Sequence, residues 1–169
     1  MKRSLVVSTL VVGAALAVAT IAAQQRAASR SGIEGVWRAV EVTTTGPNAT
    51  TVKDPQPNLS IFTAKHYSQM AVLGDKPRPE MKFGEIATAS AEQLRAVWGP
   101  FVANAGTYEV KGGEIIFHVL VAKNPGAMAP GTTLTASLKV DGNTLSTTTK
   151  SNPAGPVANP TTIKFTRVE

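Results

Sequence analysis

The stretch NAGTYEVKGGEIIFHVLVAKNPG, residues 104–126, holds two strand-like runs joined by a tight turn. The runs GTYEV and EIIFHVLVA are rich in β-branched and aromatic residues, which favour strands. Between them stand Lys111, Gly112 and Gly113, and a Gly-Gly pair adopts the positive φ angles that a short hairpin turn requires. The stretch therefore predicts a β-hairpin with His118 in its second strand.

Similar strand-like runs lie on both sides of this hairpin, and Asp141 and Gly142 mark a second hairpin turn. One interruption is helical: SAEQLRAVWGPFVANA begins with Ser90 as a cap and places apolar residues on one side. The eight predicted strands are residues 35–45, 58–64, 66–73, 106–110, 114–122, 132–140, 143–150 and 161–168.

Eight short, mostly hairpin-linked strands predict an all-β fold: an eight-stranded up-and-down antiparallel barrel with one inserted helix. Closure into a barrel removes exposed sheet edges, which one helix could not cover. An open sandwich is the alternative. A barrel of this size is either filled by side chains or holds one small ligand.

The first residues have the order of a secretory signal peptide. Lys2 and Arg3 precede a long apolar run, and a polar Gln pair follows it. We expect a signal peptide over residues 1–23, a flexible leader over 24–34 and a β-barrel domain over 35–169. The protein is then periplasmic or secreted. The alternative is an uncleaved membrane anchor, because the apolar run approaches the length of a membrane span. We expect the protein to contact a membrane only if this segment is not cleaved.

Composition narrows the function classes. The chain has no cysteine, and its net charge of +6 falls to +4 once Lys2 and Arg3 are removed. Its basic residues are scattered, so we expect no nucleic-acid partner. His66 and His118 are the only histidines, and without a ligand-spacing motif we expect no metal site and no cofactor. We expect a monomer.

Several short motifs resemble the bacterial lipocalin-like domain family. GVWRAVEV is similar to the Gly-x-Trp opening of lipocalin-type barrels, and SIFTAKHYSQMAV matches an aromatic-Thr-x-x-x-Tyr stretch of the family. The resemblance implies a calycin-like β-barrel that binds small apolar molecules. Within residues 104–126 and just after them, the positions that match the family are Gly106, Tyr108, Val110, His118, Asn124, Pro125 and Gly131.

The resemblance also implies a structural pair. In lipocalin-type folds a tryptophan of the opening strand plugs the closed end, and a basic residue near the chain end packs across its ring. Trp37 and Arg167 are the matching residues. A guanidinium over an indole contributes roughly 0.5–2 kcal/mol. The alternative role for Trp37 is a wall against which a ligand stacks.

Candidate ligand-binding residues are those that offer an aromatic body, a polar tip or an adaptable side chain to a cavity. If Phe117, Val119 and Val121 pack on the outside of the barrel, His118 points into the cavity. The alternative is a hydrogen-bonded histidine in or near the core, tied to Tyr108 on the adjacent strand. No catalytic set is predicted. The candidates for ligand contacts are His118, Tyr108, Tyr67, Met70, Trp98 and Phe101.

The sequence is compatible with three functions. The first is an exported protein that binds a small apolar or amphipathic molecule in the barrel cavity, and we prefer it. The second is a structural or envelope-interaction protein with a filled barrel. The third is a cofactor-free isomerase or cyclase that uses a cavity histidine and tyrosine as acid and base.

Overall fold

The structure, a computed structural model, describes residues 32–169. The predicted signal peptide and most of the predicted leader lie outside the described residues. The strands are β1 (Gly35–Thr44), β2 (Thr50–Lys53), β3 (Asn58–Phe62), β4 (His66–Val72), β5 (Phe101–Lys111), β6 (Glu114–Ala122), β7 (Leu134–Asp141), β8 (Thr144–Asn152), β9 (Gly155–Pro156) and β10 (Thr161–Arg167). The helices are η1 (Glu85–Ala87), α2 (Ala91–Trp98) and η2 (Pro125–Met128).

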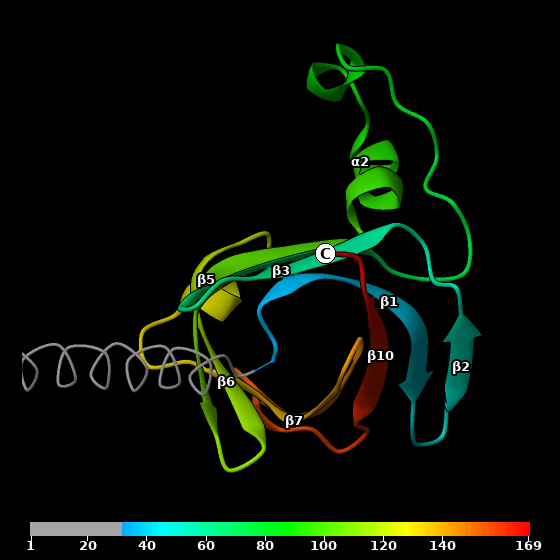
Figure 1. The fold of residues 1–169 in the computed structure, drawn as a ribbon. Coiled ribbons are helices and arrows are strands. Elements are labelled where there is room, and N and C mark those ends of the chain that lie inside the picture. Colours follow the sequence, from blue (N-terminus) through cyan, green and yellow to red (C-terminus); the bar gives the residue numbers. More distant parts are fainter. Residues whose placement is uncertain (1–31) are drawn as a thin grey trace, which may run out of the picture. The chain divides into compact units, whose positions relative to one another are not determined.

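Eight of the strands form a closed antiparallel barrel, which confirms the predicted fold and excludes the open sandwich. The strand order is β10-β1-β3-β4-β5-β6-β7-β8, and the pairing of β8 with β10 closes the ring. Figure 1 shows the strands encircling a central space. The short strands β2 and β9 are additions, because β2 pairs only with the end of β1 and β9 only with β8.

The helix and the strand after it differ from the sequence prediction. The cap predicted at Ser90 is confirmed, and the structure adds a capping box in which Ser90 and Gln93 exchange side-chain and backbone hydrogen bonds. The helix ends at Trp98, however, and β5 already begins at Phe101. Gly99 is the C-cap of the helix, and Pro100 after it has no N–H to continue a helix. Residues 101–105 therefore extend the barrel wall.

The connections give the barrel two different ends. The tight hairpins β3–β4, β5–β6 and β7–β8 lie at one end, together with the start of β1 and the end of β10, as the antiparallel order requires. The longer connections lie at the other end, and the longest joins β4 to β5 and contains α2. Figure 1 shows α2 and the loop before it standing outside the ring of strands. We call the end with the tight hairpins the closed end and the end with the longer connections the open end.

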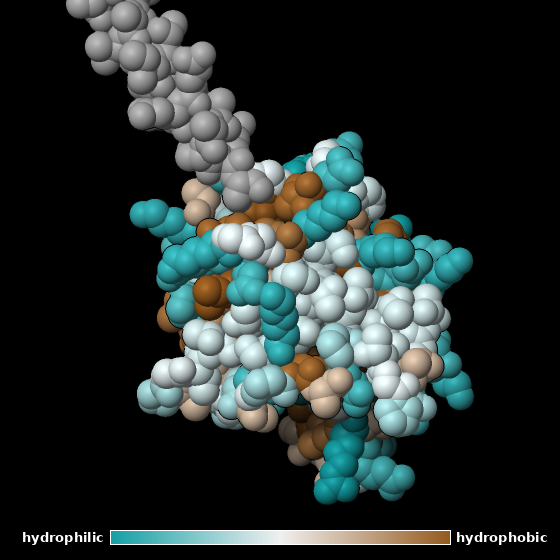
Figure 2. Space-filling model, turned by 90° about the horizontal axis from the view of Figure 1, so that it is seen from below, coloured by the Kyte–Doolittle hydropathy of each residue, from teal (hydrophilic) through white to brown (hydrophobic). Residues whose placement is uncertain are grey.

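Several large apolar side chains are exposed on the surface of the described residues. On the face shown in Figure 2, hydrophilic and near-neutral residues predominate, and hydrophobic ones gather in small areas. Phe83, in the loop before α2, is fully exposed, and Leu120 and Val121 at the end of β6 are mostly exposed. Within residues 32–169, none of the helices is long and apolar enough to cross a membrane.

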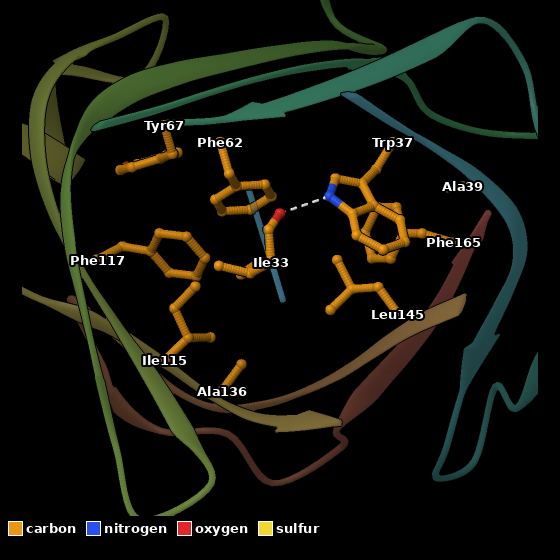
Figure 3. Close-up of a cluster of buried hydrophobic side chains, with 10 residues drawn as sticks. All are labelled: Ile33, Trp37, Ala39, Phe62, Tyr67, Ile115, Phe117, Ala136, Leu145 and Phe165. Carbon is orange, nitrogen blue, oxygen red and sulfur yellow. Dashed lines mark hydrogen bonds between the residues drawn. The ribbon is translucent and has the colours of Figure 1, made fainter. Parts of the chain in front are cut away.

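The core fills the closed end. Large side chains from opposite walls meet there, as Figure 3 shows, and Trp37 lies among them with no exposed surface. Its indole Nε1 donates a 2.7 Å hydrogen bond to the carbonyl oxygen of Ile33, and Ile33 is also fully buried. The other core members are Ala39, Phe62, Tyr67, Ile115, Phe117, Ala136, Leu145 and Phe165.

Arg167 covers the outer side of this plug. Its guanidinium Cζ lies 4.1 Å from the centre of the Trp37 ring, and its nitrogens donate to the carbonyl oxygens of Gly32 and Glu34 at 2.6 and 2.5 Å. Gly35 leaves room for this packing, because a Cβ there would collide with the Arg167 side chain. Residues 32–34, assigned to the leader from sequence, are therefore held by the barrel.

Candidate functional site

The candidate site is a cavity of about 240 Å³ inside the open half of the barrel. Its floor includes Ala39 and Phe165, which also belong to the core, so the cavity begins where the packed closed end stops. Leu73 after β4 and Val102 near the start of β5 are partly exposed, so we place the mouth of the cavity beside them. The complete lining is Ala39, Val42, Val52, Pro55, Gln56, Asn58, Ser60, Gln69, Met70, Ala71, Val72, Leu73, Gly74, Val102, Asn104, Thr161, Ile163 and Phe165.

The side chains that border this cavity are apolar or carry a neutral hydroxyl or amide. Such a surface favours an uncharged guest, because a charged group taken from water into it would find no opposite charge. None of the side chains in this lining exchanges a proton near neutral pH.

Asn58 has a structural task within the lining. Its amide oxygen accepts a 2.6 Å hydrogen bond from the Ala39 N–H, and its amide nitrogen donates to the carbonyl oxygens of Ala39 and Gln56. These bonds satisfy the backbone of β1 where that strand leaves β3 and turns toward β2. The Asn58 amide is therefore already occupied by the protein.

His118 lies on the outer face of the barrel and not in the cavity. On β6 the inward positions are Ile115 and Phe117, which are buried, and alternation along the strand turns His118 outward. Its side chain is 42% exposed, and Nε2 lies 3.3 Å from Glu109 Oε1 without a hydrogen bond. This position differs from the inward one considered from sequence, because Phe117 takes the inward place.

Glu109 is the centre of a small charged group on that outer face. Lys111 Nζ lies 2.5 Å from its carboxylate, and this ammonium is the main reason why the pKa of Glu109 is lowered from its ordinary value. The neighbouring His118 adds to the same effect. Both partners of this exposed group face solvent, so it contributes little to stability.

The two tyrosines lie toward the closed end. Tyr108 donates a 2.7 Å hydrogen bond to the carbonyl oxygen of Thr63 and meets the Phe62 ring edge to face at 5.4 Å. Tyr67 is 3% exposed and packs against Phe117 at 4.6 Å between ring centres. Burial raises the pKa of Tyr67 to about 12. Neither tyrosine borders the cavity.

Trp98 and Phe101 anchor the α2 segment to the barrel rim. Their rings meet edge to face at 6.0 Å, and the Arg78 guanidinium lies 5.3 Å from the Phe101 ring. Lys123 Nζ donates to the carbonyl oxygens of Trp98 and Phe101 and so caps the end of the helix. Neither ring borders the cavity. Met70, which is 39% exposed, is the one candidate from sequence found in the lining.

Sequence reasoning missed most of the site. It did not select Ser60, Gln69 and Asn104, the polar residues that alternate with apolar ones along β3, β4 and β5. The only available signal was the alternation of side chains along the strand. Gln69 is on the same face as Tyr67 and Ala71, so it is a polar residue on a face that points into the barrel. Lys123 gave no signal, because its partners are backbone carbonyls distant in sequence.

The closed eight-stranded antiparallel barrel defines a lipocalin-like fold. The chain belongs to the lipocalin-like domain family, whose model matches residues 34–167. No curated protein matches the sequence significantly.

Two solved structures are similar to this chain. A lipocalin-like protein from Bacteroides uniformis is 16% identical, with 81% of this chain and 99% of that chain covered and a TM-score of 0.43. An uncharacterized protein from Bacteroides eggerthii is 14% identical, with 79% and 98% covered and a TM-score of 0.41.

Proposed function

We propose that this protein binds a small, uncharged, largely apolar molecule in the cavity of its open half. The observation that carries the proposal is the division of the barrel interior. The closed end is packed around Trp37, whereas the open end keeps a cavity of about 240 Å³ with a neutral, mainly apolar lining. Protein interiors are normally packed without voids of this size.

The cavity volume limits the ligand. An engineered apolar cavity of roughly 150 Å³ holds benzene. By proportion, this cavity holds a molecule of about ten non-hydrogen atoms, such as a ring with a short chain. The cavity is smaller than the pockets that bind drug-sized ligands, which begin at roughly 300 Å³.

The two alternative functions have less support. A structural barrel with a filled interior does not account for the cavity. An isomerase or cyclase needs an acid and a base within hydrogen-bond reach of the substrate. His118 is on the outer face and Tyr108 is bonded to Thr63 at the closed end, so the two residues considered for that chemistry do not meet a ligand in the cavity.

The test is a titration with 4-propylphenol, a neutral molecule of about the estimated size, followed by NMR of the amide groups. We expect saturable shifts at residues around the cavity. Ala71→Phe fills the space from an inward position and should abolish them, and Val102→Phe provides a second blocking variant at the mouth. Ser68→Phe is the matched control, because Ser68 precedes Gln69 on the same strand and points outward.

Saturable binding that is lost in either folded blocking variant, as judged by circular dichroism, supports the proposal. Absence of binding by the unmodified protein at millimolar ligand contradicts it. Equal binding by the blocking variants also contradicts it, because the ligand would then bind elsewhere.

The proposal includes export. The basic start and apolar run of residues 1–23 support a signal peptide, and a protein outside the cytoplasm would meet small molecules from the surroundings. N-terminal sequencing of the protein from separated cell fractions tests this part. A mature chain that begins near Gln24 supports export, and a full-length chain in the cytoplasm contradicts it.

A further inference from the structure

Three polar residues form a continuous row across the cavity wall. Ser60 on β3 is paired with Gln69 on β4, and Gln69 is paired with Asn104 on β5. Because directly paired residues of antiparallel strands project to the same face, the three side chains stand side by side. All three border the cavity. We call Ser60, Gln69 and Asn104 the polar row.

The side chains of the polar row have no partners in the protein. Within residues 32–169, none of the three side chains forms a hydrogen bond, and Asn104 Oδ1 is shielded from solvent as well. Asn104 Oδ1 is the atom of the row that is both buried and without a partner, and such atoms are uncommon in folded proteins and call for an explanation. Asn58, in the same lining, shows the usual situation, since its amide is fully bonded to backbone groups.

The chemistry of the row defines what would complete it. Two amides and a hydroxyl offer both donors and acceptors within a short distance along one wall. A carboxylate or an ammonium would lose its hydration against neutral side chains. A ligand hydroxyl or primary amide can both donate and accept, so it can satisfy the row without bringing a charge.

We propose that the polar row is the specificity-determining part of the site, and that it selects ligands with an uncharged hydroxyl or primary amide at one end of an apolar body. This inference rests on the proposed binding function and adds the chemical class of the ligand. The apolar body then lies against Val42, Ala71 and Ile163 of the same cavity, and its polar end lies at the row.

The test compares two ligands of equal size, 4-propylphenol and 4-propyltoluene, which differ by a hydroxyl in place of a methyl group. Dissociation constants are measured by NMR for the unmodified protein and for Asn104→Leu, which keeps the volume and removes the amide. We expect the ratio of the two constants to shift toward the toluene by about 10-fold or more in the variant, the effect of one lost buried hydrogen bond.

Gln69→Leu should shift the ratio in the same direction and keeps the test valid if Asn104→Leu folds poorly. Ser68→Leu, on the outer face of the same strand, should leave the ratio unchanged. A second pair, 4-ethylbenzamide and 4-ethylbenzoate, tests charge, and the amide should bind more tightly.

An unchanged ratio in both row variants would overturn the role of the polar row while leaving cavity binding intact. Tighter binding of the benzoate than of the benzamide would overturn the selection of an uncharged end. If neither the phenol nor the toluene binds the unmodified protein, the binding function itself fails, and the inference fails with it. These results separate the two claims.

Discussion

Arg167 lies across Trp37, with its Cζ atom 4.1 Å from the centre of the indole ring. The pair joins the last strand to the first and is fixed further by the bonds of Arg167 to the carbonyl oxygens of Gly32 and Glu34. It seals one end of the barrel, and the space for a ligand is consequently confined to the other end. The pair is a structural element of the closed end.

Removing this guanidinium should destabilise the fold. Arg167→Ala loses the cation–π contact and two charge-assisted hydrogen bonds, and we expect the free energy of unfolding in urea to fall by about 2–4 kcal/mol. Arg167→Lys should recover only part of this loss, because an ammonium lacks the planar fork of donors. Lys139→Ala removes an exposed charge and should change stability by less than about 0.5 kcal/mol. Equal effects of the two alanine variants would contradict the assigned role.

Gly106 should tolerate no side chain. It lies at the bulge between Ala105 and Gly106 in the β5–β6 pair, and a Cβ there would fall onto the backbone carbonyl of His118. We expect Gly106→Ala to lower the free energy of unfolding by at least about 2 kcal/mol, as overpacking against a fixed backbone does. Gly84→Ala is the control, since nothing lies near its Cβ position. Similar melting temperatures for both variants would speak against the bulge geometry.

Tyr67 should make stability fall at high pH. Its hydroxyl is buried with no hydrogen-bond partner in residues 32–169, and burial raises its pKa from 10.0 to about 12. The unfolded chain therefore loses this proton before the folded protein does, and stability decreases as pH rises from about 10 toward about 12. In Tyr67→Phe this part of the decrease should be absent, as urea unfolding across that range can show. The same slope in both proteins would contradict the assignment.

The two cavity asparagines should respond in opposite ways to leucine. Asn104→Leu removes a shielded oxygen that has no partner, a defect of about 1–3 kcal/mol, and should raise the free energy of unfolding of the ligand-free protein. Asn58→Leu removes three hydrogen bonds to the backbone of Ala39 and Gln56 and should lower it. Differential scanning calorimetry of the two variants provides the comparison. Destabilisation by both would mean that Asn104 is bonded in solution.

The barrel could be predicted from sequence because its signals are local. Gly112 and Gly113, and Asp141 with Gly142, specify hairpins by their backbone preferences, and alternation along each strand marks its two faces. The family resemblance also pointed to Trp37 and Arg167. The start of β5 was placed five residues late, because the apolar spacing of Trp98 and Phe101 suits a helix as well as a rim contact.

The site was harder to predict because it depends on pairing between strands. Ser60 and Gln69 face each other across one hairpin, but Asn104 is distant in the sequence, and only the register of β3, β4 and β5 aligns the three. His118 attracted attention as a chemically versatile residue between apolar neighbours, yet those neighbours on both faces left its direction undetermined. The buried Phe117 decides it in the structure.

Diffraction from crystals soaked with 4-bromophenol shows whether the open half of the barrel receives a small neutral molecule. The bromine gives an anomalous signal that locates the ligand without assumptions about its pose. We predict a peak inside the cavity bordered by Ala71, Val102 and Ile163, with the hydroxyl toward Asn104. Bromine peaks confined to the outer surface at saturating ligand would contradict the account.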